Sequence, residues 1–545
     1  MRIICLPILL IALLYGHVLS PVAAQSDFNK PAVIISIKAI DEQVKDVKNL
    51  MNVAGFGFFA PMIDASISEY VRGIDTKKPI GIAVNFPDAS RSPVVVAYLP
   101  ITDFEDVLDT VADFADINED GPRVELVLDD GTKLYVENRQ GFALITNHQD
   151  HLEMAANDLS EELVDLPTRF NFAARIYGQR IPAEMRDQAM EMLRQGVEQS
   201  IPNSDDIDDA EIQIRAIEEM LTEIDVLVVG LSMDRSRNSI AFDFEISGLP
   251  GSKLVEQAKV GVSNTSKFAG FPAQDAAISA NGCVTMLPED AANLKRSIDS
   301  SLQSMLDNLA EEMSKRDFEI VEKLIAEFVE VLKSTMDDGI MDVGVIGYMD
   351  KERFDIAMGA RNSDTSKFES TVRKLVDELQ QKANEDGVKM EIQFDESTHR
   401  GIVMHRVQVE VPSHEQELKN AIGDTVEIIV GIGQGESYFA VGQNPKSLLI
   451  EAIDRSASAS GNPGTADVTI AMAPIMEFAQ KFVQDGSLDE ITEKLRKDQN
   501  DKINYRSRFL SNGLSYSFEI QNGIVAAIAG LAGQLGRMGG FGDDF

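Results

Sequence analysis

Two β-type runs, Val226-Leu-Val-Val-Gly-Leu-Ser-Met233 and Ser239-Ile-Ala-Phe-Asp-Phe-Glu-Ile246, flank the polar turn Asp234-Arg-Ser-Arg-Asn238. β-Branched and aromatic residues favour strands, and a short polar segment between two such runs indicates a hairpin. Asp129-Asp130-Gly131 joins Val124–Leu128 to Lys133–Glu137 in the same manner. Strands joined by tight turns pair antiparallel, so the chain is predicted to contain an antiparallel sheet.

Helical segments are predicted between the groups of strands. Asp103–Phe114 is amphipathic and begins with an Asp or Thr N-cap. The longest helical region repeats apolar residues at i, i+3 and i+4 from Leu294 to Leu332. A stripe this wide has to be buried against a sheet or another helix. The fold class is therefore predicted to be α+β, with long amphipathic helices layered on an antiparallel sheet.

Three ordered sequence matches predict that the chain consists of two duplicated halves. In two of them the context is also similar, since a helix is expected beside each matched strand or turn. A repeat unit of more than 200 residues is a whole domain, not a solenoid unit of 20–50 residues. The matches pair Asn118-Glu-Asp-Gly121 with Asn384-Glu-Asp-Gly387, Phe142-Ala-Leu-Ile-Thr-Asn147 with Phe439-Ala-Val-Gly-Gln-Asn444, and Asp243-Phe-Glu-Ile-Ser247 with Ser517-Phe-Glu-Ile-Gln521.

The predicted domain organisation follows from this duplication and from the composition of the two ends. Its segments are a signal peptide at 1–24, a first α+β repeat at 25–262, a linker at 263–275, a second α+β repeat at 276–534 and a flexible Gly-rich tail at 535–545.

The first 24 residues have the zones of a cleavable export signal. Arg2 supplies the positive charge, Ile3–Leu14 is almost wholly apolar, and Val22-Ala-Ala24 provides small residues for cleavage after Ala24. An apolar run of about twelve residues is too short to span a bilayer, which needs about 20. Export to the periplasm, cell envelope or exterior is therefore expected. The mature chain would keep a single cysteine, Cys283, so no internal disulfide can form.

Composition excludes several classes of function. The formal net charge of −39 opposes sequence-independent binding to nucleic acid and electrostatic docking on an anionic membrane. The hydrophobic content of 44% is that of a globular protein. The apolar run 523–532 is about half the length of a membrane span, and a packed terminal helix is expected there instead.

One candidate metal site resembles the start of a calcium loop. Asp116, Asn118 and Asp120 stand at positions 1, 3 and 5 of such a loop, and Gly121 stands at position 6. The bidentate Glu of position 12 is missing, because Val127 stands there. The alternative is a simple turn, which the second half would share.

A second candidate site is the pair His148 and His151, which could present two imidazoles on one face of a helix to zinc. The corresponding residues of the second half are Pro445 and Leu448, so the alternative is an ordinary helix start. Neither candidate supplies a complete set of ligands, and no cofactor is predicted.

Compact catalytic motifs are incomplete. Gly230-Leu-Ser-Met-Asp234 and Gly513-Leu-Ser-Tyr-Ser517 both lack the last glycine of a nucleophile elbow and continue as strands. Gly431-Ile-Gly-Gln-Gly435 runs into another strand, which indicates a hairpin turn and not a phosphate-binding helix start.

Several segments together resemble a family of uncharacterised exported proteins of planctomycete-type bacteria, a family with no known activity. The resemblance implies a cell-envelope location and assigns no functional residue. It rests on Phe170–Tyr177, Ile181–Arg186, Lys78–Gly81, Pro93–Pro100 and Thr102–Phe104.

Two functions are consistent with the sequence. The favoured one is a non-catalytic envelope protein that binds an unknown protein or small ligand through its sheet surface or a cleft between its repeats. The alternative is an exported hydrolase whose carboxylate or metal-ligating residues are dispersed along the chain.

Overall fold

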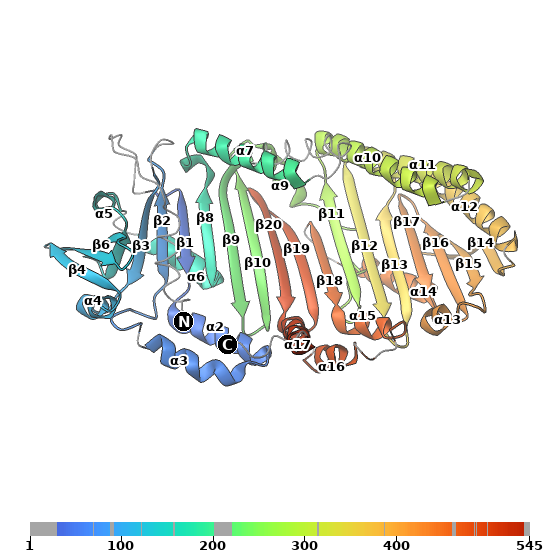
Figure 1. Ribbon diagram of the computed structural model, residues 1–545. Coiled ribbons are helices and arrows are strands. Elements are labelled where there is room, and N and C mark those ends of the chain that lie inside the picture. The colour runs from blue at the N-terminus through green and yellow to red at the C-terminus, as the bar shows by residue number, and fades with distance from the viewer. Residues whose placement is uncertain are drawn as a thin grey trace. The chain divides into compact units, whose positions relative to one another are not determined.

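The computed structural model describes residues 30–538 except 69, 88–91, 121, 156–158, 201–217, 219–220, 313–314, 386, 460–464, 484–485, 487 and 499. The chain divides into two compact units (Figure 1). The first comprises Met1–Ser252 with Val525–Phe545, and the second comprises Lys253–Ile524.

In the first unit the described strands form an antiparallel sheet in the order β4-β5-β6-β7-β3-β2-β1-β8-β9-β10. Their bounds are β1 Val33–Ile37, β2 Ile80–Asn85, β3 Val94–Pro100, β4 Ala115–Asp120, β5 Arg123–Leu128, β6 Lys133–Arg139, β7 Phe142–Thr146, β8 Phe172–Tyr177, β9 Ile224–Asp234 and β10 Ser239–Gly248.

Two helices of the first unit, α5 and α6, cover one face of this sheet. Leu152 of α5 and Leu163 of α6 belong to one buried cluster with Ile34, Val96 and Leu144 of the strands. The predicted helix at 103–114 is confirmed as α4, whose N-cap Asp103 accepts the backbone N–H groups of Glu105 and Asp106. The described helices are α2 Ile40–Val53, η1 Gly57–Phe59, α3 Ala60–Ser68, α4 Phe104–Val111, α5 Gln149–Met154, α6 Ser160–Arg169, η2 Gly178–Arg180 and α7 Ala183–Ser200.

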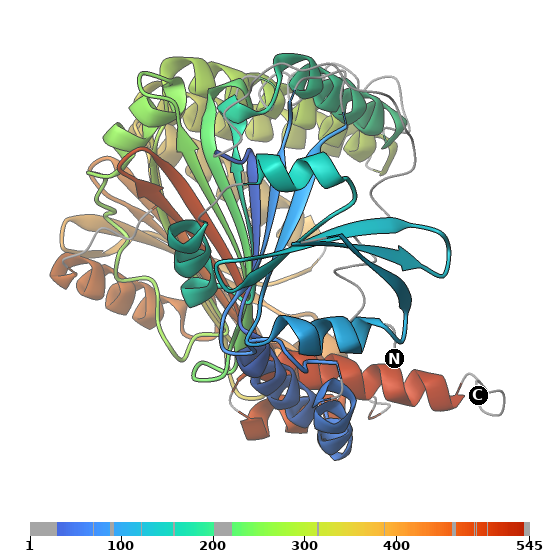
Figure 2. The same ribbon diagram turned by 90° about the vertical axis from the view of Figure 1, so that its left-hand side faces the viewer.

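The strands β4 to β6 turn across the opposite face of the sheet (Figure 2). Leu126 and Val136 of these strands share a buried cluster with Ala97 of β3, Ile145 of β7 and Val107 of α4. Strands β4 to β6 therefore cover β3 and β7 on the face opposite α5 and α6.

In the second unit the described strands are also antiparallel, in the order β14-β15-β16-β17-β13-β12-β11-β18-β19-β20. Their bounds are β11 Ile278–Thr285, β12 Ile340–Met349, β13 Phe354–Arg361, β14 Met390–His399, β15 Ile402–Glu410, β16 Thr425–Ile432, β17 Glu436–Gly442, β18 Ala466–Ala471, β19 Lys502–Leu510 and β20 Gly513–Gln521.

The helices of the second unit cover parts of both faces of its sheet. Leu448 and Leu449 of α14 join the largest buried cluster on one face, with Ile346, Met404 and Ile429 of the strands. On the other face, Val372 and Val376 of α12 pack against β14 to β16. The described helices are α9 Lys253–Gly261, α10 Pro288–Glu312, α11 Lys315–Asp337, α12 Thr365–Glu385, α13 Gln416–Ile422, α14 Pro445–Ser458, α15 Met472–Ala479, α16 Asp489–Asp498 and the start of α17 Asn522–Met538.

The predicted α+β class with an antiparallel sheet is confirmed. The strand order of the second unit is that of the first with ten added to every number. Helix pairs also follow the first strand of each unit, α2 with α3 and α10 with α11.

Two of the three sequence matches do not pair equivalent residues. Asn118 lies within strand β4, whereas Asn384 lies in helix α12, so the shared Asn-Glu-Asp-Gly is not a shared turn. Phe142 packs against the buried cluster under α5 and α6, whereas Phe439 is exposed on the other face of its sheet. A slip of one residue reverses the face of a strand residue, which explains the second mismatch.

The third match is consistent with the structure, since Phe244 and Phe518 are exposed residues of the last strand of their units.

The predicted segment boundaries differ from the compact units. Helix α9 is grouped with the second unit, and residues 525–545 with the first. Residues 263–275 do not form a loose linker, because Phe268 and Phe271 are fully buried in the core of the second unit. Their rings fill the space beside Gly344 and Gly359, where a Cβ atom would overlap them. The signal peptide and the last residues of the tail lie outside the described residues.

Replacing Phe268 with Ala should destabilise the second unit by about 3–5 kcal/mol, because it leaves a cavity in a packed core. Denaturant unfolding of the mature chain would measure the change. Phe114→Ala is the matched control, since Phe114 is 45% exposed and its loss should cost about 1 kcal/mol or less. Equal effects of the two substitutions would show that residues 263–275 act as a linker.

Candidate ligand-binding faces

Side chains alternate between the two faces of each strand, and in the first unit the two faces have different neighbours. On β10, Glu245 points toward α6, where it pairs with Arg169. The intervening residues Phe242 and Phe244 point to the other face and are 45% and 41% exposed. The same alternation holds on β8 and β9, where Ala173 and Val228 are buried against Leu166.

The residues of the other face define the open face of the first unit. All of them are apolar, and none is buried. They are Val33, Ile35, Ile37, Phe172, Ala174, Ile176, Leu227, Val229, Leu231, Met233, Ile240, Phe242, Phe244 and Ile246.

These residues form continuous rows across the strands. One row pairs Ile35 with Ala174, then Val229, then Phe244. A second pairs Ile37 with Phe172, then Leu231, then Phe242. Side chains directly opposite one another on antiparallel strands touch, so each row is an unbroken apolar track.

The second unit has an open face of the same kind, formed by the partly or fully exposed apolar residues on one side of its strands, whereas Ser437 and Ser507 on that side are buried. It consists of Ile278, Ala280, Val345, Ile356, Met358, Phe439, Val441, Val468, Ile470, Ile503, Tyr505, Phe518 and Ile520.

One row of this face crosses seven strands, from β17 to β20. Neighbouring strands lie about 4.8 Å apart, so its length is about 29 Å. Both ends of the row are exposed aromatic residues. In order, the row is Phe439, Met358, Val345, Ala280, Val468, Tyr505 and Phe518.

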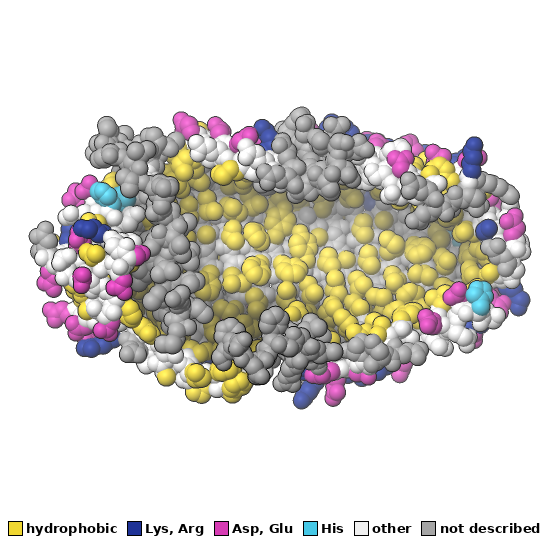
Figure 3. Space-filling view, viewed as in Figure 1, with side chains coloured by type: hydrophobic (Ala, Val, Ile, Leu, Met, Phe, Trp, Pro, Cys, Tyr) yellow, Lys and Arg dark blue, Asp and Glu magenta, His cyan; other side chains and the backbone are white. Residues whose placement is uncertain are grey.

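The open faces are the place where this protein leaves apolar strand residues uncovered. Every exposed large hydrophobic residue on a described strand belongs to one of them. Hydrophobic side chains accordingly dominate the strands of both units in the view of Figure 3. Backbone polar groups in the sheet are used by strand pairing, and the side chains on these faces carry no charge. The faces can therefore offer dispersion contacts and burial of apolar surface, with very few hydrogen bonds.

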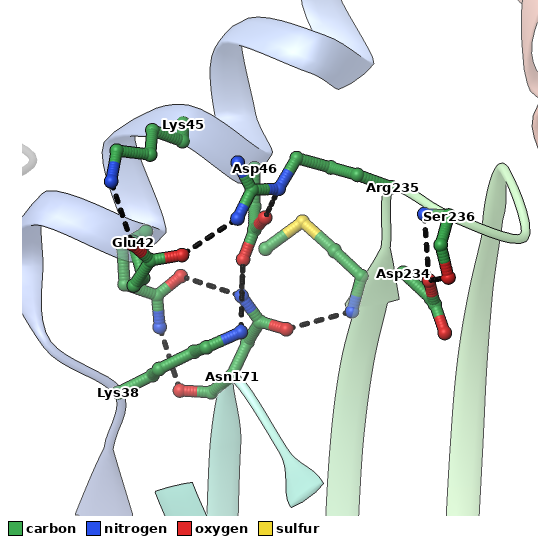
Figure 4. Close-up of polar contacts among 10 residues, drawn as sticks. Lys38, Glu42, Lys45, Asp46, Asn171, Asp234, Arg235 and Ser236 are labelled. Carbon is green, nitrogen blue, oxygen red and sulfur yellow. Dashed lines mark hydrogen bonds and ion pairs between the residues drawn. The ribbon is translucent and has the colours of Figure 1, made fainter. Parts of the chain in front are cut away.

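A polar cluster lies at one end of the first open face and joins α2 to the strands (Figure 4). Asp46 of α2 is almost fully buried, and its Oδ2 accepts a hydrogen bond of 2.6 Å from Asn171 Nδ2. Lys38 and Arg235 lie 3.3 Å and 2.7 Å from the same carboxylate. Asn171 Oδ1 in turn accepts the backbone N–H of Met233.

The carboxylates of this cluster are paired with its lysine and arginine side chains. Arg235 also contacts Glu42, and hydrogen bonding to Lys45 together with the charges of Lys45 and Arg235 holds the pKa of Glu42 below its usual value. A carboxylate that is held ionised by cations is a poor proton donor. The cluster therefore anchors α2 to the sheet and does not resemble a catalytic centre.

Glu369, Asp395 and His405 form a group in the second unit whose potential ligand atoms lie within 4.8 Å of one another. Arg373 already lies between the two carboxylates, with Nη2 2.7 Å from Glu369 and 3.0 Å from Asp395. His405 Nδ1 accepts the backbone N–H of Asp395, and burial followed by the charge of Arg373 lowers the pKa of His405. A metal ion would have to displace the guanidinium, so the arrangement is an ion-pair cluster around a neutral histidine.

Sequence inspection missed this cluster, since its members come from helix α12 and strands β14 and β15 and form no local motif.

The predicted calcium ligands do not form a loop. Asp116 and Asn118 lie in the extended strand β4, where they pair with Val127 and Glu125. Because β4 is an extended, paired strand, this segment does not curl around an ion as the ligands of a calcium loop must. Asn118 instead donates to Glu125 and contributes to its lowered pKa, after the larger effect of Lys133. The side chain of Asp120 and the whole of Gly121 lie outside the described residues.

His148 and His151, the predicted zinc ligands, lie at the N-terminus of helix α5. His148 is the N-cap of α5, and its Nδ1 accepts the N–H of Asp150. His151 Nδ1 lies 3.3 Å from Thr146 Oγ1, and burial lowers the pKa of His151 to about 4. The two rings are 5.2 Å apart between centroids. Among the described residues no third His, Cys, Asp or Glu completes a group with them.

Cys283 is buried, and burial followed by the charge of Asp342 raises the pKa of its thiol to about 11. A thiol in that state is a poor nucleophile, so Cys283 packs as a small apolar residue.

Comparison with known proteins yields no relative, since no protein-family model, curated protein or solved structure matches the chain. In the part of the chain that the structure describes, no helix combines the length and apolarity needed to cross a membrane.

Asp46→Ala should lower the free energy of unfolding by about 1–3 kcal/mol, because the buried amide of Asn171 loses its carboxylate acceptor. Hydrogen exchange of the amides of α2 should become faster in the same variant. The control is Glu42→Ala, which removes a 37% exposed partner of Arg235 and should cost less than about 1 kcal/mol. Unchanged exchange in α2 after Asp46→Ala would contradict an anchoring role.

Proposed function

We propose that this protein is an exported, non-catalytic binding protein whose two open faces take up the alkyl chains of a lipid. The observation that carries the proposal is the set of apolar rows that no described helix covers. Each unit leaves such rows half-exposed, although solvent contact with apolar surface is unfavourable. A ligand that covers them would remove this cost.

The chemistry of the faces favours alkyl chains over a protein partner. Protein–protein interfaces carry roughly one hydrogen bond per 100–200 Å² and are enriched in arginine. The open face of the first unit contains neither a polar nor a charged side chain. A bilayer core of about 30 Å holds two layers of acyl chains, so the 29 Å row estimated for the second unit exceeds the length of one chain.

We further propose that the two units arose by duplication. The support is the shared strand order, because independent sheets of ten strands rarely adopt the same non-sequential order. The sequence match that pairs Phe244 with Phe518 is consistent with a duplication.

Export is part of the proposal. Outside the cytoplasmic membrane the alkyl chains of a lipid would be in contact with water unless a protein covered them. The zoning of residues 1–24 supports cleavage after Ala24. N-terminal sequencing of protein recovered from outside the cytoplasm should begin at Gln25. Recovery of chains that retain Met1 would contradict export by this signal.

The ligand proposal is tested with delipidated mature protein and a fluorescent fatty acid whose emission rises in apolar surroundings. Phe244→Asp and Phe518→Asp should each weaken binding to their unit by about tenfold or more, because a carboxylate must be desolvated under the bound chain. Ser247→Asp and Ser517→Asp introduce the same charge on the opposite face of the same strands and should leave binding unchanged.

Organic extraction of the undelipidated protein followed by mass spectrometry should recover acyl lipids. Failure to recover any lipid, together with equal fatty-acid binding by all four variants, would overturn the proposed function.

A further inference from the structure

The turn between α2 and α3 exposes an unusual concentration of large apolar side chains. Phe58 is 70% exposed and Met62 is 62% exposed, while Phe56 and Phe59 are 46% and 40% exposed. None of the four belongs to a described core cluster or to the open faces. We call residues 54–62 the aromatic elbow.

The aromatic elbow is a defined turn that holds these rings outward. Gly55 has a φ of +84°, and the N–H groups of Gly55 and Phe56 bond to the carbonyls of Asn52 and Met51. This is the Schellman arrangement that ends a helix in the left-handed region. A Cβ atom at Gly57 would overlap the side chain of Asn52, so a larger residue there would have to displace that side chain.

The elbow and the residues next to it in the sequence carry no charged side chain. Residues 49–63 contain no charged side chain, although 26% of the whole chain is charged. The nearest charges on either side, Lys48 and Asp64, pair with each other. The elbow can therefore leave water without desolvating an ion.

We propose that the aromatic elbow is a membrane-docking tip that inserts Phe56, Phe58, Phe59 and Met62 into the interfacial region of a lipid bilayer. Phenylalanine and aliphatic side chains exposed on a helical surface can enter the boundary between the headgroups and the acyl chains. For a chain of net charge −39, an uncharged tip is the part that can approach a membrane without electrostatic repulsion at the contact itself.

A second copy of the chain fits the elbow less well. Taking about 200 Å² for a fully exposed aromatic side chain, the four residues expose on the order of 400 Å². A stable interface buries about 800 Å² per partner. A bilayer needs no complementary shape and covers a protruding corner from all sides.

The chain contains no tryptophan, so Phe58→Trp creates a unique fluorescent reporter. With phosphatidylcholine vesicles, its emission in the mature protein should shift to shorter wavelength and be quenched by brominated lipid. Phe114→Trp, at a 45% exposed aromatic position outside the elbow, should show neither change. Phe58→Ser with Phe59→Ser should lower vesicle partitioning of the protein by about tenfold or more.

Salt and lipid charge provide a second signature. Partitioning should be weaker on vesicles containing anionic lipid than on zwitterionic ones, and added salt should reduce that difference by screening. Stronger binding to anionic vesicles would contradict the proposal, as would an emission spectrum of the Phe58→Trp variant that vesicles leave unchanged.

A concentration-dependent shift without lipid, accompanied by dimerisation that Phe58→Ser abolishes, would assign the elbow to a second copy and overturn the membrane proposal. The inference is independent of the proposed alkyl-chain binding. Phe244→Asp should leave vesicle docking intact, and the Phe58→Ser, Phe59→Ser variant should still bind the soluble fatty-acid probe.

Discussion

The alternation of side chains along antiparallel strands is the constraint on which the rest of this structure depends. Because successive residues point to opposite faces, each strand can bury one set against helices and present the other set elsewhere. In the first unit the set that includes Ala173 and Val228 is buried under α6, and the set that includes Phe172 and Val229 is not. The second unit repeats this division.

Helix placement then determines which apolar surface remains open. Helices α5 and α6 in the first unit, and α14 in the second, cover one face over several strands. On the other face, strands β4 to β6 or helix α12 cover only one end of the sheet. The uncovered remainder is wide and apolar, and the proposed uptake of alkyl chains would cover it. Polar groups outside it, such as Asp46 with Arg235 or Glu369 with Arg373, neutralise one another.

Local rules recovered many elements from the sequence. The hairpin at Asp129-Asp130-Gly131, the N-cap Asp103 and the helix start at His148 all depend on a few neighbouring residues, and all occur as predicted. The Asn-Glu-Asp-Gly match was misleading because a short local sequence does not determine the element in which it lies. Four residues determine a local preference, but strand β4 and helix α12 are selected by what each segment packs against.

The sequence by itself determined the α+β class and the antiparallel pairing of neighbouring strands, because periodicity and turn residues are local properties. It also led to the prediction, which stays untested, that a ligand or partner binds at the sheet surface or in a cleft between the repeats. Only the tertiary structure decided the strand order, the burial of Phe268 and Phe271, and which apolar side chains remain exposed. The hydrophobic pattern of a strand is the same whether a helix covers its second face or not. Coverage depends on which helix packs against which strands in three dimensions, as α6 does against β1 and α14 against β13, and no local pattern encodes those contacts.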